Sequence, residues 1–126
     1  MLTKNMSVYV TNVKTRLKVS YMYIIFDKYN AKLNNFKVGG TDHKINTRLA
    51  GYNVGRTGDT VCYYAYLKRC YNFRLAESMV KNILSDFVID YGKEMYHMHY
   101  KALCDILDLI IESQDMVYEP FKCLIS

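Results

Sequence analysis

The most constraining feature of the sequence is an unbroken apolar run at residues 21–26, YMYIIF. Six aromatic and aliphatic residues in succession, followed by a turn-prone polar stretch, are typical of a strand. Because the run has no alternation of polar and apolar residues, we expect both faces of this strand to be buried. Residues 36–38, which end at Gly39 and Gly40, predict a short second strand that forms a hairpin with the first.

A second apolar stretch, VCYYAYL at residues 61–67, predicts a third strand. Its continuous apolar and aromatic character favours a central place in the sheet, next to the first strand. Residues 8–10 (VYV) are a further strand candidate within a basic N-terminal segment.

Apolar residues at helical spacing predict three helices. The first follows the candidate N-cap residues Thr41 and Asp42, places apolar side chains at i, i+4 and i+7, and ends near Asn53 and Gly55. The second has the best 3.6-residue period in the chain, with a stripe at Leu75, Met79, Val80, Ile83, Leu84 and Phe87. After Gly92, the third has a stripe at Leu103, Leu107, Ile110 and Ile111. The prediction is an α+β fold, with a small three- to four-stranded antiparallel sheet flanked by about three helices.

Length and composition place the chain among ordinary globular domains. The 126 residues are 51% hydrophobic and 23% charged, which predicts one packed domain over residues 1–126 and argues against a disordered or fibrous chain. No window approaches 18 consecutive apolar residues and the N-terminus lacks a secretory pattern, so we expect an intracellular protein that is not in a membrane. The cysteines lack any CxxC spacing and are expected to be reduced, mostly buried thiols: Cys62, Cys70, Cys104 and Cys123.

Charge is distributed unevenly along the chain. Residues 1–74 contain 13 of the 17 Lys and Arg and carry a net charge of +10, whereas residues 75–126 carry −5. A basic half suits a polyanion such as DNA, because each cation placed on a phosphate releases condensed counterions. The alternative is an ordinary solvated basic face, and halves of opposite sign also favour self-association, so a homodimer is an open possibility.

Two charged residues lie on the flanks of the predicted apolar stripes. On a helical wheel, Arg48 is roughly 70° from the centre of its stripe and Glu77 roughly 105° from the centre of the next. Both side chains can reach a groove. A carboxylate can hold Mg²⁺ or Mn²⁺, and an arginine can stabilise charge on a phosphate, which together suit phosphodiester hydrolysis. The alternative is two surface residues or a salt bridge.

The order of motifs resembles that of GIY-YIG nuclease domains. Residues 21–23 (YMY), 37–39 (KVG) and 48–53 (RLAGYN), followed by a helix with Glu77, are most similar to the branch of phages and large DNA viruses, the type associated with Bro and KilA domains. The resemblance covers a core of about residues 20–112. It implies a metal-dependent endonuclease that hydrolyses DNA phosphodiester bonds, with substrates that include branched or structured DNA.

The resemblance also assigns roles to residues. Tyr23 corresponds to the tyrosine of the first motif, Arg48 to the arginine that engages the scissile phosphate, and Tyr52 to the aromatic residue one helical turn later. Glu77 corresponds to the metal-binding glutamate. Gly39 matches the glycine that closes the second motif, where a hairpin turn with positive φ is an alternative reason for glycine.

The sequence departs from the family pattern at two places. Lys37 stands at the tyrosine of the second motif; a lysine can bind phosphate but is a poor base at neutral pH. The late asparagine of the family has no clear counterpart, although residues 93–96 (KEMY) resemble the glutamate-aromatic signature that ends the viral branch. These departures leave two alternatives open: a nucleic-acid-binding module that does not cut, and a protein-interaction domain.

Three further residues invite a functional interpretation. Arg56 is a candidate phosphate contact, or else a solvated loop residue. His97 and His99 form an HxH pair, but no Cys, Asp or Glu beside them completes a metal site, so we do not expect one there.

Overall fold

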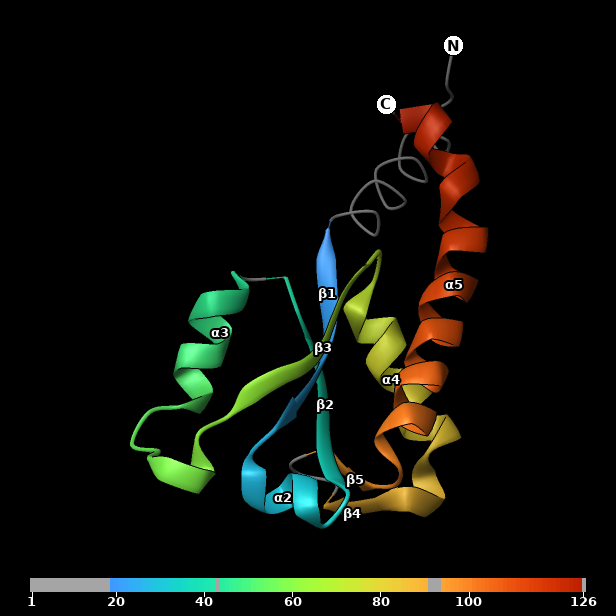
Figure 1. The fold of residues 1–126 in the computed structure, drawn as a ribbon. Helices are drawn as coiled ribbons and strands as arrows, with labels where there is room; N and C mark the ends of the chain where they lie inside the picture. The colour runs from blue at the N-terminus through green and yellow to red at the C-terminus, as the bar shows by residue number, and fades with distance from the viewer. Residues whose placement is uncertain (1–18, 43, 91–93, 126) are drawn as a thin grey trace.

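The computed structural model describes residues 19–42, 44–90 and 94–125, which form an antiparallel sheet of five strands with helices on both faces (Figure 1). The strands are β1 (Ser20–Phe26), β2 (Asn35–Thr41), β3 (Tyr63–Cys70), β4 (Val88–Asp90) and β5 (Met95–His97). The α-helices are α2 (Lys28–Lys32), α3 (Ile45–Tyr52), α4 (Phe73–Ile83) and α5 (Tyr100–Ile125). The α+β class is confirmed, with one more strand and one more helix than the sequence predicted.

Strand β1 lies between β3 and β2, in the sheet order β3-β1-β2-β5-β4. Side chains alternate along it: Met22 and Ile24 join the core beneath α4 and α5, whereas Tyr23 and Ile25 join a smaller cluster beneath α3. All four are at most 3% exposed. The prediction of a strand buried on both faces is therefore confirmed, and the unbroken apolar run is explained by helices on the two faces.

The predicted hairpin of β1 and β2 is confirmed, with Tyr23 opposite Gly39. The short helix α2 occupies the connection that the sequence analysis took for a turn. It begins at Asp27, whose Oδ1 accepts a hydrogen bond from the backbone N–H of Asn30 at 2.7 Å. Gly39 lies within β2 and has no positive φ, so the prediction of a turn glycine is wrong.

Strand β3 pairs with β1 as predicted but lies at the edge of the sheet, so its predicted central place is wrong. Its aromatic side chains are half-buried rather than enclosed, and their hydroxyl groups bond to neighbouring elements. Tyr66 donates to Asp108 of α5 at 2.7 Å, and the hydroxyl of Tyr100 donates to the carbonyl of Ala65. Aromatic residues with a polar end suit such partly covered positions.

Helix α4 ends at Ile83, so the predicted helical stripe up to Phe87 is wrong at its end. Val80 and Leu84 are buried as predicted, but Leu75, Ile83 and Phe87 are between 44% and 53% exposed. A 3-10 turn at Ser85–Phe87 leads instead into β4. Strands β4 and β5 have three residues each and are too short to show a periodic pattern in the sequence.

Helix α3 differs from the prediction at its start, whereas the buried stripe of α5 is as predicted. Lys44 is the N-cap of α3 and makes no side-chain cap bond, so the predicted capping by Thr41 or Asp42 is wrong, whereas Asn53 is the C-cap as predicted. The predicted stripe of α5 is confirmed, with each residue at most 3% exposed: Leu103, Leu107, Ile110 and Ile111. The strand candidate at residues 8–10 lies outside the described residues.

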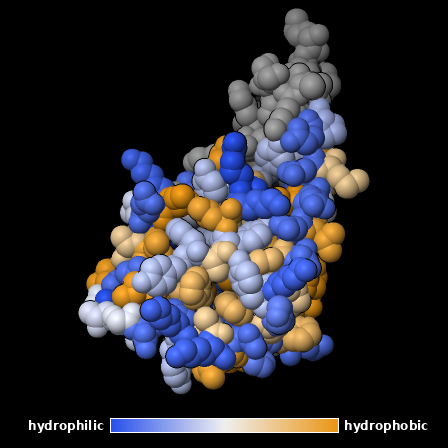
Figure 2. Space-filling view, in the orientation of Figure 1, coloured by the Kyte–Doolittle hydropathy of each residue, from blue (hydrophilic) through white to orange (hydrophobic). Residues whose placement is uncertain are grey.

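None of the helices within the described residues is both long and apolar enough to cross a membrane. Hydrophilic and hydrophobic side chains intermix over the face of the described residues in Figure 2. Free thiols are found at Cys62 and Cys70, both buried, and at the half-buried Cys104.

Candidate functional site

Three of the candidate residues form one hydrogen-bonded cluster on the face of the sheet beneath α3. The hydroxyl groups of Tyr23 and Tyr52 lie 2.9 Å apart. Arg48 Nε donates to the Tyr23 hydroxyl at 3.2 Å, and its Nη2 donates to the Tyr52 hydroxyl at 3.4 Å. Arg48 and Tyr52 are one helical turn apart on α3, so both reach the same buried hydroxyl on β1.

Gly39 makes room for the Tyr23 ring. A Cβ atom at position 39 would lie 2.6 Å from the Tyr23 hydroxyl oxygen and 2.7 Å from Cζ, closer than side-chain atoms can approach. Because Tyr23 and Gly39 are opposite each other in neighbouring strands, the ring leans across the glycine. The glycine of the second motif is therefore required by close approach and not by backbone conformation.

Other contacts fix α3 and its tyrosine. The Tyr64 hydroxyl donates to the carbonyl of Ile45 at 2.7 Å, which ties β3 to the first turn of α3. Lys37 Nζ lies 4.9 Å from the centre of the Tyr52 ring, and the Arg48 guanidinium carbon lies 5.1 Å from it. Tyr52 is thus contacted by two cations, each in the range of a cation–π interaction.

A pair of half-buried carboxyl groups forms the acidic part of the site. Glu77 lies on α4, and Glu94 directly precedes β5. Glu94 Oε1 forms an ion pair with Lys81 Nζ at 2.9 Å. Burial raises the pKa of Glu77 from 4.5 to about 7, and the neighbouring Glu94 carboxyl adds to this effect. Glu94 is not among the site residues predicted from the sequence, although it is the glutamate of the glutamate-aromatic signature at residues 93–96.

The acidic part lies close to the basic part, near the edge of β2 that β5 leaves unpaired. Strand β5 pairs with β2 only over residues 35–37, and the backbone N–H of Val38 donates to the carbonyl of Glu94 at 3.2 Å. Beyond this point no strand of the described residues pairs with β2 on the side of β5, so side chains from the two faces of the sheet can approach each other around this edge. Arg48 is close enough to Glu77 for its charge to lower the pKa of that carboxyl, against the stronger effect of burial.

Tyr23 is fully buried, and this determines its ionisation. Burial raises the pKa of Tyr23 well above its ordinary value of 10, the hydrogen bond with Tyr52 adds to this, and Arg48 only partly opposes it. The hydroxyl group therefore stays protonated at neutral pH. The same contacts raise the pKa of Arg48, mainly through its hydrogen bond to Tyr23. Arg48 therefore gives the cluster a permanent positive charge.

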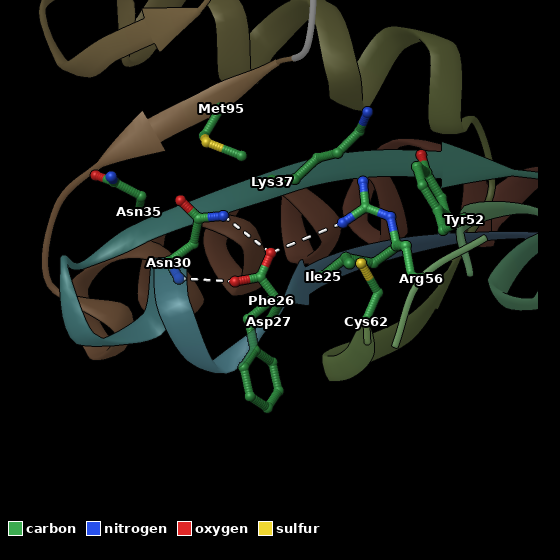
Figure 3. Close-up of a pocket in the computed structure, with 10 residues that line it drawn as sticks. All are labelled: Ile25, Phe26, Asp27, Asn30, Asn35, Lys37, Tyr52, Arg56, Cys62 and Met95. Atoms are coloured by element: carbon green, nitrogen blue, oxygen red, sulfur yellow. Dashed lines mark hydrogen bonds and ion pairs between the residues drawn. The ribbon is translucent and has the colours of Figure 1, made fainter. Parts of the chain in front are cut away.

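A cavity of about 260 Å³ lies beside this cluster, at the ends of β1 and β2 near α2 (Figure 3). Its lining includes Lys37 and Tyr52, and therefore continues from the cluster. Arg56 lines it as well, with Nη1 at 3.8 Å from Asp27 Oδ2 and 3.2 Å from the carbonyl of Thr60. The structure thus brings Arg56 close to Lys37 and Tyr52 along one continuous surface.

Both histidines of the HxH pair have hydrogen-bond partners in the structure. His97 Nδ1 is hydrogen-bonded to the side chain of Asn35 at 2.9 Å, and His99 Nδ1 accepts from the backbone N–H of Lys101 at 3.1 Å. Within residues 19–42, 44–90 and 94–125, no three His, Cys, Asp or Glu side chains are grouped so that they could hold a metal ion.

Comparison with known proteins identifies the domain. The family model described as the T5orf172 domain matches residues 20–111, nearly the whole described part of the chain. The chain belongs to the T5orf172 domain family. The match spans every element from β1 to the middle of α5, and therefore includes all the residues of the cluster and both carboxyl groups. No solved structure matches this T5orf172 domain significantly.

Relatives of this T5orf172 domain occur in two invertebrate iridescent viruses. The chain is 32% identical over 96 residues to "Putative Bro-N domain-containing protein 289L" of Invertebrate iridescent virus 6, which covers 75% of the chain and 23% of that protein. It is 30% identical over 99 residues to the Bro-N domain-containing protein 019R of Invertebrate iridescent virus 3, covering 78% of the chain and 24% of that protein. The MSV199 domain-containing protein 420R of the first virus is 29% identical over 115 residues, 90% of the chain and 26% of that protein. The chain therefore spans about a quarter of the length of the curated relatives it matches.

Proposed function

We propose that this T5orf172 domain is a divalent-metal-dependent endonuclease of the GIY-YIG type that hydrolyses DNA phosphodiester bonds. The observation that carries the proposal is that Arg48, held by two tyrosine hydroxyls, lies close enough to the half-buried Glu77 for its charge to lower the pKa of that carboxyl. The resemblance of the sequence motifs named these residues, and they come from three separate elements. A cation that stabilises charge on the phosphate and a carboxylate that can hold a metal ion together suit phosphodiester hydrolysis.

The two carboxyl groups fit a hard divalent cation. Oxygen ligands suit Mg²⁺ and Mn²⁺, and Mg²⁺ is commonly bound by one or two carboxylates together with waters and substrate phosphates. The raised pKa of Glu77 also shows that this carboxyl is difficult to ionise without a nearby positive charge. Glu77 would hold the ion with help from Glu94. The bound ion would supply charge to polarise the scissile phosphate and to stabilise the leaving oxygen.

The protein side chains bind and orient the substrate. Arg48 donates N–H groups to the scissile phosphate, with the geometry that a guanidinium offers to two oxygens. Lys37 is placed to bind an adjacent phosphate. Tyr52 is half-exposed, and its hydroxyl lies beside the Arg48 guanidinium, where it can orient the attacking water.

Tyr23 acts as a positioning residue. It is fully buried and stays protonated, so it holds Arg48 and Tyr52 and does not accept a proton from water. Phenylalanine at position 23 would keep the ring and remove both hydrogen bonds. In nicking assays, we expect Tyr23→Phe to lower kcat and to leave the pH profile of cleavage unchanged. A shift of that profile would instead indicate that Tyr23 transfers a proton.

The proposal is tested by incubating the protein with supercoiled plasmid in Mg²⁺, in Mn²⁺ and in chelator. We expect nicking only with metal, its loss in Glu77→Gln, and a fall of about 100-fold or more in Arg48→Ala. Glu112→Gln, which removes an exposed carboxylate from α5, is the matched control and is expected to cut normally. Metal-independent nicking, or full activity of Glu77→Gln, would refute the proposal.

A second candidate function is a binding module that holds nucleic acid without cutting it. Lys37 favours this alternative, because a lysine stands where other nucleases of the GIY-YIG type have a tyrosine, and it contacts the Tyr52 ring. In that case the plasmid is retained at low salt, retention falls steeply with ionic strength, and metal has no effect. A protein-interaction domain is indicated if no DNA is retained at all. The homodimer and the intracellular location remain predictions.

A further inference from the structure

The cavity beside the cluster has a mixed polar lining, and the roles assigned above leave most of it unused. Its centre is the carboxylate of Asp27, whose side chain is 9% exposed. As Figure 3 shows, Asn30 donates to this carboxylate with its backbone N–H at 2.7 Å and with its Nδ2 at 2.9 Å. Arg56 faces the same carboxylate from the opposite side.

Asp27 has acceptor capacity left for a ligand. An ionised carboxylate offers about four lone-pair positions, of which the Asn30 bonds use two. Arg56 Nη1 lies 3.8 Å from Oδ2, beyond hydrogen-bond distance, so this ion pair occupies neither remaining position with a direct bond. A ligand placed between the two side chains can therefore accept a hydrogen bond from Arg56 and donate one to Asp27.

The polar groups match a nucleobase better than a phosphate. A phosphate site contains donors, whereas the Asp27 carboxylate repels an anion. The edge of a base has donors and acceptors side by side, which the carboxylate, the guanidinium and the Asn30 amide complement. Ile25, Cys62 and Met95 add apolar surface for a flat ring.

Size and position indicate a single base. The cavity of about 260 Å³ lies below the range of roughly 300 to 1,000 Å³ of sites for drug-sized ligands. It shares Lys37 and Tyr52 with the surface proposed to bind the phosphates. A base that enters the cavity would therefore remain joined to a backbone held at the cluster.

We propose that this cavity binds one unpaired base of the DNA strand that crosses the cluster, so the substrate class is DNA with an unpaired nucleotide beside the cut. This inference rests on the proposed function for the identity of the strand. A base paired within a duplex cannot present its Watson–Crick edge to Asp27 until the pair is broken, so recognition favours a bulge, a gap or a branch, where no pair has to be broken.

The test measures binding in chelator, so it does not depend on cleavage. Two duplexes are compared by fluorescence anisotropy: one with a single bulged nucleotide, and one with the same bulge made abasic, which keeps the phosphates and the flexibility. We expect the base to tighten binding about tenfold, since enclosing one base contributes in this range. Equal affinity for the two duplexes, or no binding of either, would overturn the inference.

A variant locates the base within the protein. Met95→Trp fills the cavity and is expected to abolish the difference between the two duplexes. Ile89→Trp, at a 51% exposed position of β4, is the matched control and is expected to keep the tenfold difference. If Met95→Trp still binds the bulged duplex more tightly than the abasic one, the base lies elsewhere on the protein. If this variant misfolds, the comparison of the two duplexes on the unaltered protein still tests the inference. Failure of plasmid nicking with Mg²⁺ would refute the nuclease alone, because the preference for the base is measured without metal.

Discussion

The ionisation of Glu77 offers the sharpest test of the site, because it affects the stability of the protein and can be measured without DNA. Burial, reinforced by Glu94, raises the pKa of this carboxyl from 4.5 to about 7. Between these pH values the folded protein keeps a proton that the unfolded chain has lost. The stabilising contribution of the protonated group is therefore complete below about pH 4.5 and is lost as pH rises through 7.

The magnitude follows from the same pKa. In full, a rise from 4.5 to about 7 corresponds to about 3 kcal/mol of unfolding free energy. Because the carboxyl is only half-buried, solvent screening reduces this to roughly 1 to 2 kcal/mol. Glutamine at position 77 keeps the size and cannot ionise, so Glu77→Gln should gain that amount relative to the unaltered protein between pH 5 and pH 8.

The assay is urea unfolding of both proteins at pH 5 and pH 8 in chelator. Asp105→Asn, which neutralises an exposed carboxylate of α5, controls for the change in net charge and should show no such gain. A difference between Glu77→Gln and the unaltered protein that is the same at both pH values would refute the reasoning.

Metal extends the same experiment. At pH 8, Mg²⁺ at ten times its Kd should stabilise the unaltered protein by about 1.4 kcal/mol, because it binds the folded state alone. Glu77→Gln should gain little from the same addition. Equal stabilisation of the two proteins would remove Glu77 from the metal site.

Three other predictions concern packing and charge. Gly39→Ala forces a Cβ against the Tyr23 ring and should lower the unfolding free energy by about 1 to 3 kcal/mol. Gly51→Ala, in α3 with open space around it, should instead raise the unfolding free energy by about 0.5 to 1 kcal/mol. Urea unfolding measures both, and equal effects of the two substitutions would contradict the contact between Gly39 and Tyr23. Tyr64→Phe removes the hydrogen bond to the first turn of α3 and should cost about 1 kcal/mol in the same assay; no loss would show that the bond contributes nothing. Lys37→Ala should reduce the slope of log affinity against log salt for DNA by about 1, and an unchanged slope would remove Lys37 from the phosphate contacts.

Several features of the fold could be predicted because they depend on residues close together in the sequence. The run at residues 21–26 is apolar at every position, and only a strand covered on both faces accommodates that pattern. Helix α4 was predicted from its period, and the stripe of α5 was confirmed residue by residue. The spacing of Arg48 and Tyr52 on one helix likewise placed them on one side of α3.

Other features depended on contacts between distant segments. The apolar run of β3 predicted a central strand, yet β3 lies at the edge, because its tyrosines use their hydroxyl groups to reach α3 and α5. Strands β4 and β5 are too short to leave a pattern. The reason for Gly39 became visible only when the Tyr23 ring was found across it.

The sequence by itself determined the α+β class, the strand that is buried on both faces and the identity of the residues that the nuclease motifs select. Only the tertiary structure decided that Glu94 joins Glu77, that Tyr23 is buried and stays protonated, and that Asp27 lines a cavity next to Lys37. The physical reason is that secondary structure follows from local periodicity, whereas burial, pKa and the shape of a cavity arise from segments that meet only after the chain has folded.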